Sequence, residues 1–391
     1  MMLRRTFYSL AFIFFFFSAC KSNSKPQNIT VQDEQSIVHK EPIPENELNA
    51  YKHRLTAYFD SMLLKTNFNG SILVAKGGNI LYEAYIGYPN PGKKSDTINL
   101  HTSFHLASTS KPFTGVAVMK LVEAGKISLD NDIISYFSGF PYSGITVRHL
   151  LTHRSGLPNY LYFMDDKEKW DQSAMPSNQD VLDFLIKHQP DKTAIPGRRF
   201  QYCNTNYVLL ALIIEKVTGK SFPQYMKETI FEPLGMKNTF VYTRSDSAGA
   251  IMSYKPSGAV WSNDKYEYTY GDKNIYSTPR DLFKWDSALY QNNFISKAAL
   301  DSSFVPRSNE KPSIHNYGYG WRMLNFKNGK NVIYHFGKWH GFTPAFARLT
   351  DEKVVIIILG NRYSRRIYEA AKHAYDIFGS YSENNAPTDL E

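Results

Sequence analysis

A serine and a lysine stand three residues apart, as Ser108 and Lys111, within the stretch FHLASTSKPFTG at residues 104–115. Residues with this spacing share one face of a helix, so the lysine amine can reach the serine hydroxyl. A neutral amine can take the hydroxyl proton and so make the serine a nucleophile. The same spacing recurs at four other places, which are Ser18/Lys21, Ser22/Lys25, Ser262/Lys265 and Ser308/Lys311. The spacing by itself therefore identifies no site.

Context sets Ser108 apart from the other four serines. It stands at the start of the apolar stretch FTGVAVMKLVEAG, whose pattern predicts a helix. The N-terminus of a helix presents backbone N–H groups that stabilise a developing negative charge. The other copies fall in the N-terminal segment or in polar loops, and none of them has this setting.

Two further polar groups adjoin apolar stretches. Tyr202-Cys203-Asn204 precedes YVLLALII, so both polar side chains are expected at a helix start, where a tyrosine held near cations can relay protons. This signal is weak alone, because Tyr88-x-Asn90 and Tyr290-x-Asn292 share the spacing. His335-Phe336-Gly337 ends the strand-like stretch NVIYHFG, and glycine on a strand lets a ligand approach the backbone closely.

In this order, Ser-x-x-Lys, Tyr-x-Asn and His-x-Gly resemble the three motifs of the serine β-lactamase and penicillin-binding protein superfamily. The surrounding sequence is similar to the class C β-lactamase-related branch, which includes D-Ala-D-Ala carboxypeptidases, D-aminopeptidases and esterases. The similar stretches are LLTHRSGLPNY, IPGRRFQYCNTNYVLLALIIEKVTGKSF, IFEPLGMKNT and IYSTPRDLFKWDSAL. The resemblance covers about residues 50–378.

The resemblance implies a role for each motif residue. Ser108 would be the nucleophile that forms an acyl-enzyme, with Lys111 assisting removal of its proton. Tyr202 would be a general acid and base for the leaving group. His335 stands where many members have lysine, and its ordinary pKa of about 6.5 predicts a turnover that changes between about pH 5 and 8. The backbone N–H groups of Ser108 and Lys338 would form the oxyanion hole.

The resemblance also implies that Asn204 contacts the substrate, and Gly337 would let the substrate approach the strand. Trp339 is a candidate contact for an acidic or aromatic substrate if it is exposed at the cleft, and is otherwise a simple strand-edge residue.

Three positions depart from the usual pattern, because Lys338 stands in place of a hydroxylated residue and Phe336 and Cys203 replace residues that are commonly smaller or hydroxylated. Strand alternation predicts that the Phe336 side chain points away from the site. We interpret Cys203 as a small packed side chain.

The order of the predicted elements indicates an α/β (α+β) fold. A helix is expected at 47–66 and a hairpin at 70–88 around Lys76-Gly77-Gly78-Asn79. Mainly helical patterns follow, then strands at 317–326, 331–337, 342–349 and 353–361, and a helix at 363–378. We predict a β-lactamase/transpeptidase-like antiparallel sheet flanked by helices, with its α/β part at about 47–110 and 275–380 and an inserted all-α subdomain at about 111–274.

The N-terminus predicts export. Arg4 and Arg5 precede the apolar run Leu10–Phe17 and then small residues, which is typical of a signal peptide at 1–19. Phe17-Ser18-Ala19-Cys20 resembles the lipobox of bacterial lipoproteins, so Cys20 is the expected lipidation site. We expect a flexible tether at 20–46, a catalytic domain at 47–380 and a disordered tail at 381–391. The location implied is the bacterial cell envelope, with a lipid anchor in a membrane and the domain facing the periplasm.

The amino-acid composition and charge limit the classes of partner that this protein is expected to bind. With 42% hydrophobic, 15% aromatic and 21% charged residues, the chain is neither disordered nor a coiled coil. The net charge of +9 comes from scattered Lys and Arg, which predicts a basic soluble surface without a nucleic-acid site and leaves peptidoglycan as a candidate partner. No cofactor is expected. His149 and His153 stand four apart without an evident third metal ligand, so we expect structural roles for both.

These observations favour a serine hydrolase that acts through an acyl-enzyme on a D-amino peptide, ester or β-lactam. The alternative is a non-catalytic penicillin-binding sensor or binding module with the same fold. The intact set of motif residues favours the enzyme.

Overall fold

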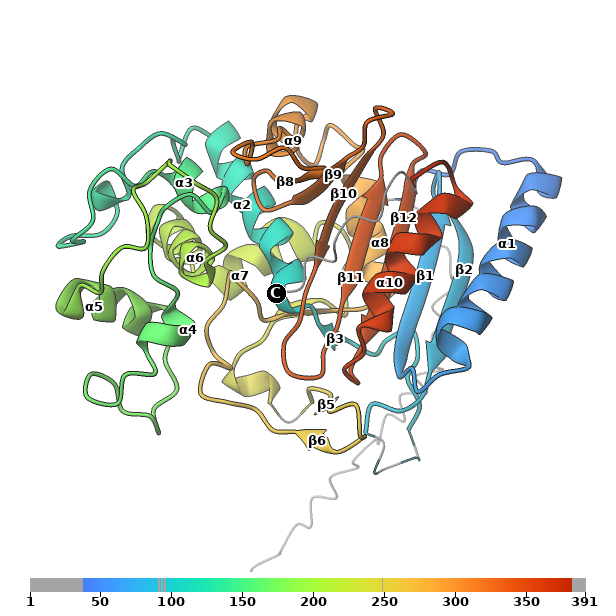
Figure 1. The fold of residues 1–391 in the computed structure, drawn as a ribbon, viewed down its shortest axis with the longest axis horizontal. Coiled ribbons are helices and arrows are strands. Elements are labelled where there is room, and N and C mark those ends of the chain that lie inside the picture. The colour runs from blue at the N-terminus through green and yellow to red at the C-terminus, as the bar shows by residue number, and fades with distance from the viewer. Residues whose placement is uncertain (1–37, 91, 93, 95, 248, 382–391) are drawn as a thin grey trace, which may run out of the picture.

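The structure is a computed structural model that describes residues 38–90, 92, 94, 96–247 and 249–381 (Figure 1). The predicted signal peptide, Cys20 and most of the predicted tether lie outside the described residues. Among the described residues, no helix is both long and apolar enough to cross a membrane.

A seven-stranded antiparallel sheet is assembled from both ends of the chain, in the order β2-β1-β12-β11-β10-β9-β8. The strands are β1 (Gly70–Lys76), β2 (Asn79–Ile86), β8 (His315–Tyr317), β9 (Arg322–Asn325), β10 (Asn331–Phe336), β11 (Ala345–Leu349) and β12 (Val354–Gly360). The predicted hairpin is present, since β1 and β2 pair antiparallel. Gly77 and Gly78 form its turn with positive φ values of 50° and 76°. The predicted antiparallel sheet is thus confirmed.

Helices cover both faces of this sheet. The flanking helices are α1 (Glu45–Phe59), α8 (Pro279–Ala288), α9 (Lys297–Ser303) and α10 (Arg366–His373). One core joins α1 and α10 to alternate strand residues such as Ile72 and Ile356, and the other core joins α8 and the inserted helices to their neighbours Leu73 and Ile357. Strand alternation therefore decides which residues of β10 face the inserted helices.

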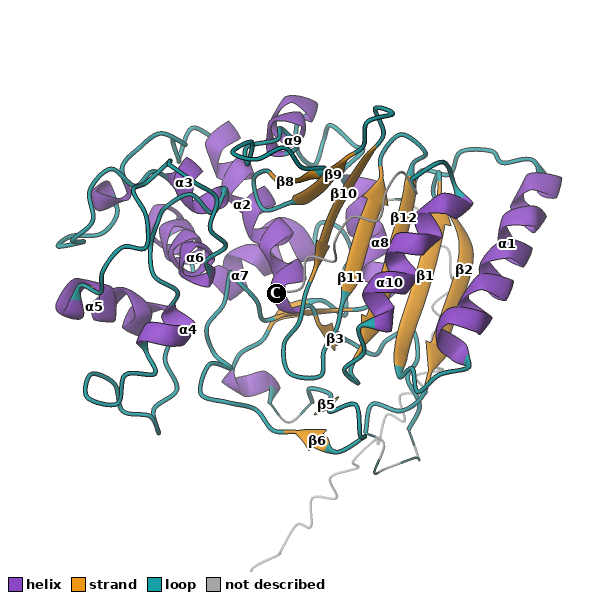
Figure 2. Cartoon of the chain, in the orientation of Figure 1, coloured by secondary structure: helices purple, strands orange, loops and turns teal. Residues whose placement is uncertain are grey.

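The inserted segment is mainly helical and gathers beside the sheet (Figure 2). Its helices are α2 (Lys111–Glu123), α3 (Val147–Leu151), α4 (Tyr160–Phe163), α5 (Asn178–His188), α6 (Asn204–Thr218) and α7 (Phe222–Met226). Its short strands, which the sequence pattern did not predict, are β4 (Phe240–Val241), β5 (Ser253–Tyr254) and β6 (Val260–Trp261), and two more, β3 (Phe104–His105) and β7 (Ile275–Ser277), flank it. Strands β3, β7 and β4 form one small sheet, and β5 pairs with β6.

The structure differs from the expectations at three places. The strand expected at 317–326 is a hairpin of β8 and β9, because Gly320 takes a φ of 88° in the turn between them. The described end of the expected tether is not free, since the N–H of Glu41 donates to the carbonyl of Gly77 at 2.8 Å. The fold also extends to Tyr381, which was expected in the tail but is 5% exposed.

Candidate active site

Ser108 lies in a tight turn between β3 and α2. The preceding residue, Ala107, has a φ of 47°, a value that residues with a Cβ rarely adopt, and such strain is typical of functional turns. The turn is held by buried His105, whose Nδ1 accepts the N–H of Ala107 at 2.8 Å and whose Nε2–H donates to Asn274 Oδ1 at 2.8 Å. From Phe104 to Met119, Ser108 is the one residue that is not fully buried. The sequence therefore presents a single polar group of this turn to solvent.

Lys111 is completely buried, and its amine is satisfied there by hydrogen-bond acceptors from other parts of the chain. The Nζ atom donates to Ser108 Oγ at 3.2 Å, to Asn204 Oδ1 at 2.8 Å and to the carbonyl of Asp272 at 2.9 Å. The predicted pair therefore meets, as the helical spacing required. In its neutral form this amine, 3.2 Å from Ser108 Oγ, can take the hydroxyl proton directly.

The second motif joins this pair at the start of α6. Tyr202 and Asn204 are partly exposed while Cys203 between them is buried, so the motif alternates toward and away from the site. The Lys111 amine lies 4.7 Å from the centroid of the Tyr202 ring. Cys203 donates its thiol to the carbonyl of Leu157 at 3.3 Å, and burial raises its pKa to about 11. The interpretation of Cys203 as a packed side chain is confirmed.

The third motif lies against the nucleophile from the sheet side. Thr109 donates its hydroxyl to the carbonyl of His335 at 3.1 Å. Gly337 packs so closely that an added Cβ would stand 2.7 Å from the backbone nitrogen of Ser108. Lys338 follows Gly337 directly and has an exposed side chain. The backbone segments predicted to form the oxyanion hole, Ser108 and Lys338, are therefore brought to one place.

His335 and Phe336 lie on opposite faces of β10. Phe336 stacks on Tyr368 of α10 with ring centroids 5.5 Å apart, so it points away from the site as predicted. His335 is buried on the other face, 6.3 Å from the Tyr202 ring centroid. Burial lowers the pKa of His335 well below its ordinary value, and the charges of Arg322 and Lys111 act in the same direction. The expectation that His335 titrates near its ordinary pKa is corrected, because burial and the neighbouring charges favour the neutral imidazole.

Three residues of the site were missed by sequence reasoning. Arg322 on β9 places its guanidinium 5.2 Å from the Tyr202 ring centroid. His153, which was expected to be structural, packs against Tyr202 with ring centroids 4.3 Å apart and the ring planes at 34°. Tyr317 on β8 pairs with Arg322 across the hairpin and reaches both His153 and His335. The motif spacing gave no signal for these contacts, whereas His149 caps α3 at Thr146, which agrees with its expected structural role.

Trp339 lies beyond the third motif in a cluster of charged side chains. Its Nε1–H donates to Glu267 Oε1 at 3.1 Å, and the Lys273 amine lies 4.7 Å from its ring centroid. Trp339 is thus half-buried at the rim of the site and held by partners within the chain.

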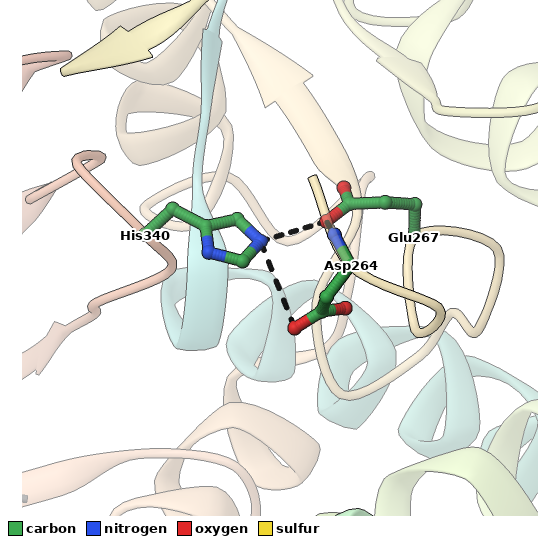
Figure 3. Close-up of side chains that lie close together, drawn as sticks. All are labelled: Asp264, Glu267 and His340. Atoms are coloured by element: carbon green, nitrogen blue, oxygen red, sulfur yellow. Dashed lines mark hydrogen bonds and ion pairs between the residues drawn. The ribbon is translucent and has the colours of Figure 1, made fainter. Parts of the chain in front are cut away.

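The same cluster is a group that could hold a metal ion. His340 Nε2 lies 2.8 Å from Glu267 Oε1 and 3.8 Å from Asp264 Oδ2 (Figure 3). Burial opposes ionisation of Glu267, but the His340 hydrogen bond and the nearby charge of Lys273 hold its pKa below the ordinary value. The hydrogen bond between His340 and Glu267 ties the loop after the third motif to the inserted segment.

The other Ser-x-x-Lys copies among the described residues have no such surroundings. Ser262 is exposed, and Lys265 donates instead to the carbonyl of Met164 at 2.8 Å. Only the copy at Ser108 adjoins the second and third motifs.

Comparisons with known proteins agree with this geometry. A family model described as "Beta-lactamase" matches residues 65–377. The chain is 36% identical to "Penicillin-binding protein 4*" of Bacillus subtilis, over 87% of this chain and 79% of that protein. It is 26% identical to "Protein flp" of Staphylococcus aureus over 78% of this chain, and it spans 61% of that protein's length.

Solved structures show the same architecture. A penicillin binding protein from Bacillus halodurans superposes with a TM-score of 0.71 at 26% identity, over 83% of this chain and 99% of that chain. A D-amino acid amidase from Ochrobactrum anthropi SV3 has a TM-score of 0.66 at 24% identity, over 84% of this chain and 99% of that chain. The latter likeness concerns the fold.

Proposed function

Because the chain belongs to the beta-lactamase family, we propose that it is a serine hydrolase that forms an acyl-enzyme on Ser108 with a D-amino peptide, an ester or a β-lactam. The observation that carries this proposal is the contact of the Lys111 amine with both Ser108 Oγ, at 3.2 Å, and Asn204 Oδ1, at 2.8 Å. One amine thus joins the nucleophile to the residue that would orient the substrate amide.

The proposed reaction proceeds in two stages. Lys111 takes the proton of Ser108, and Oγ attacks the carbonyl carbon to form a tetrahedral adduct whose oxygen is stabilised by the N–H groups of Ser108 and Lys338. Tyr202 then donates a proton to the leaving group, which departs and leaves the acyl-enzyme. Water attacks the acyl ester with Tyr202 accepting its proton, the bond between the acyl carbon and Oγ breaks, and Lys111 returns its proton to Oγ to regenerate Ser108.

The charges beside Tyr202 favour substrates with an anionic group. Arg322 lies near the Tyr202 ring and Lys111 becomes a second cation there once it has taken the Ser108 proton, while His335 contributes no charge at neutral pH. A peptide that ends in a D-amino acid carries a carboxylate next to its scissile bond, and a penicillin carries one next to its lactam. The name of the Bacillus subtilis relative, a penicillin-binding protein, supports this substrate class.

Turnover of a p-nitrophenyl ester tests the nucleophile while asking little of the pocket. Wild type should release p-nitrophenol, Ser108→Ala should not, and Ser262→Ala should behave as wild type because it alters an exposed copy of the same spacing. A penicillin should add its mass to wild type and not to Ser108→Ala. A stable Ser108 adduct without any turnover would point to the binding module, and the absence of both turnover and adduct would refute the proposal.

We also propose that the enzyme is anchored in the cell envelope through a lipid on Cys20. Support comes from the sequence of residues 1–20. A fatty-acid label supplied to growing cells should mark the wild-type protein and spare Cys20→Ala. A wild-type protein that carries no label would overturn this anchor.

A further inference from the structure

The imidazole of His153 can carry its proton on only one nitrogen. His153 follows α3 with a φ of 53° and is completely buried. Its Nδ1 accepts the backbone N–H of Cys203 at 3.1 Å and faces the side-chain amide of Asn206 at 3.3 Å. Burial, with the nearby charge of Lys111, lowers its pKa well below the ordinary value, so the ring is neutral. The proton therefore lies on Nε2.

The imidazole of His335 has the opposite tautomer. Its Nδ1 lies 2.7 Å from the carbonyl oxygen of Phe336, and a carbonyl can only accept. The proton therefore lies on Nδ1, and Nε2 of this neutral ring is an acceptor.

One hydroxyl joins the two rings. Tyr317 Oη lies 3.2 Å from His153 Nε2 and 3.3 Å from His335 Nε2. Since His153 must donate and His335 must accept, the Tyr317 hydroxyl accepts from the first and donates to the second. This chain of hydrogen bonds runs from the backbone of Cys203 in the second motif to the backbone of Phe336 in the third.

The rings of His153, Tyr317 and His335 all lie close to the Tyr202 ring. The Tyr202 ring centroid lies 4.3 Å from that of His153, 6.4 Å from that of Tyr317 and 6.3 Å from that of His335. We propose that Tyr317 is a positioning residue, which links His153 and His335 in the opposite tautomers that their backbone partners set and so holds Tyr202 in register with Ser108. The inference rests on the proposed function, because Tyr202 is the group that it positions for proton transfer.

Holding His153 and His335 in their neutral forms has a chemical advantage at this site. A protonated ring at either histidine would add a cation beside Arg322 and beside Lys111, which becomes charged when it takes the Ser108 proton. The hydrogen bond from Tyr317 stabilises the neutral form of His335 and thereby disfavours that third charge. The arrangement leaves the Lys111 amine as the base for Ser108.

Nitrogen NMR of the purified full chain, labelled in its histidines, tests the tautomers without any substrate. Signals of the two rings are assigned by their loss in His153→Gln and in His335→Gln. The proposal expects an Nε2–H ring for His153 and an Nδ1–H ring for His335 at pH 7. An Nε2–H tautomer or a charged ring at His335 would overturn it, even if the enzyme is fully active.

Kinetics of Tyr317→Phe test the consequence, with Tyr319→Phe as the matched control. Tyr319 is a buried tyrosine in the adjoining turn, and its hydroxyl bonds Arg148 instead of the site. Tyr317→Phe should lower kcat/KM about tenfold through kcat and move the acid limb of the pH profile upward, because His335 loses a bond that favours its neutral form. Tyr319→Phe should change neither.

Equal kcat/KM and an unchanged acid limb in Tyr317→Phe would overturn the positioning role. If the wild type itself turns over no substrate, the proposed function fails. The NMR measurement of the two tautomers still tests the hydrogen bonds that join His153, Tyr317 and His335. If Tyr317→Phe does not fold, the NMR measurement on wild type remains decisive.

Discussion

Gly337 lies directly against the nucleophile turn, with the position of an added Cβ only 2.7 Å from the backbone nitrogen of Ser108 and 2.8 Å from the carbonyl oxygen of Leu106. No Cβ fits this gap without a shift of backbone. The third motif thus requires glycine, because a side chain there would hold the strand away from the backbone of the nucleophile turn.

Gly337→Ala should therefore disable the oxyanion hole while sparing the fold. Separation of the two backbone segments removes a hydrogen-bond donor, which typically costs about 10²–10³ in kcat. Ester turnover and circular dichroism would be measured together. Gly249→Ala is the control, because its Cβ would meet nothing closer than 4.0 Å. Unchanged kcat in Gly337→Ala would contradict the assignment.

Removal of the Lys111 amine should abolish acylation. Lys111→Met keeps much of the side-chain volume but takes away the base, and positioned bases contribute about 10²–10⁴-fold. The rate of penicillin or ester acylation reports the loss. Lys120→Met on the same helix removes an amine that bonds the carbonyl of Phe294, so its acylation rate should match wild type. Similar rates in the two variants would show that Lys111 is not the base.

The buried thiol of Cys203 should be inert in the folded protein. Its pKa of about 11, raised by burial, leaves almost no thiolate at pH 8. Iodoacetamide should leave Cys203 unmodified in buffer and modify it in urea, as read by peptide mapping. Cys203→Ala should retain kcat/KM within about twofold, since loss of one small packed group typically costs about 1 kcal/mol of stability. Rapid alkylation in buffer would contradict the buried geometry.

Buried histidines should make the fold sensitive to acid. Burial lowers the pKa of His105 to about 4, so below about pH 6.5 the unfolded chain binds a proton there that the folded protein does not. The free energy of unfolding therefore falls as pH decreases from 6.5 to 4, by up to about 1.4 kcal/mol per pH unit for this group. His153 and His335, whose pKa values are also lowered, act in the same direction.

Urea unfolding of wild type and His105→Gln between pH 7 and 5 checks this slope. The variant will be less stable at every pH, since it loses the bond that holds Ala107. Its stability should nevertheless depend less steeply on pH than that of wild type. Parallel curves for the two proteins would show that His105 is not protonated on unfolding.

The three motifs were predictable from sequence because each relies on local geometry. Ser108 and Lys111 share a helix face, and Phe336 points away from the site through strand alternation, so local geometry predicted these side-chain positions once context and the family resemblance had singled out the motifs. The order of helices and strands likewise indicated a sheet built from both chain ends. These features depend on periodicity, which the sequence displays directly.

Tyr317 and Arg322 could not be predicted in the same way. They reach the site because β8 and β9 fold into a hairpin, whereas the stretch 317–326 looked like one strand. His335 was expected to titrate near neutral pH because sequence does not reveal burial or the charge of Arg322. What sequence missed are contacts and desolvation between segments far apart in the chain.

An ion pair buried between α8 and β11 offers a last prediction, on stability. Arg348 is 1% exposed and its Nε donates to Asp286 Oδ1 at 2.5 Å. Asp286→Asn leaves a buried guanidinium without its anion, so unfolding in urea should show a loss of about 3–5 kcal/mol. The double variant Asp286→Leu/Arg348→Met removes both charges and should recover much of that loss, because buried pairs can be replaced by apolar residues at little cost. A single variant as stable as wild type, or a double variant less stable than the single, would show that this pair does not join the helix to the sheet as the geometry indicates.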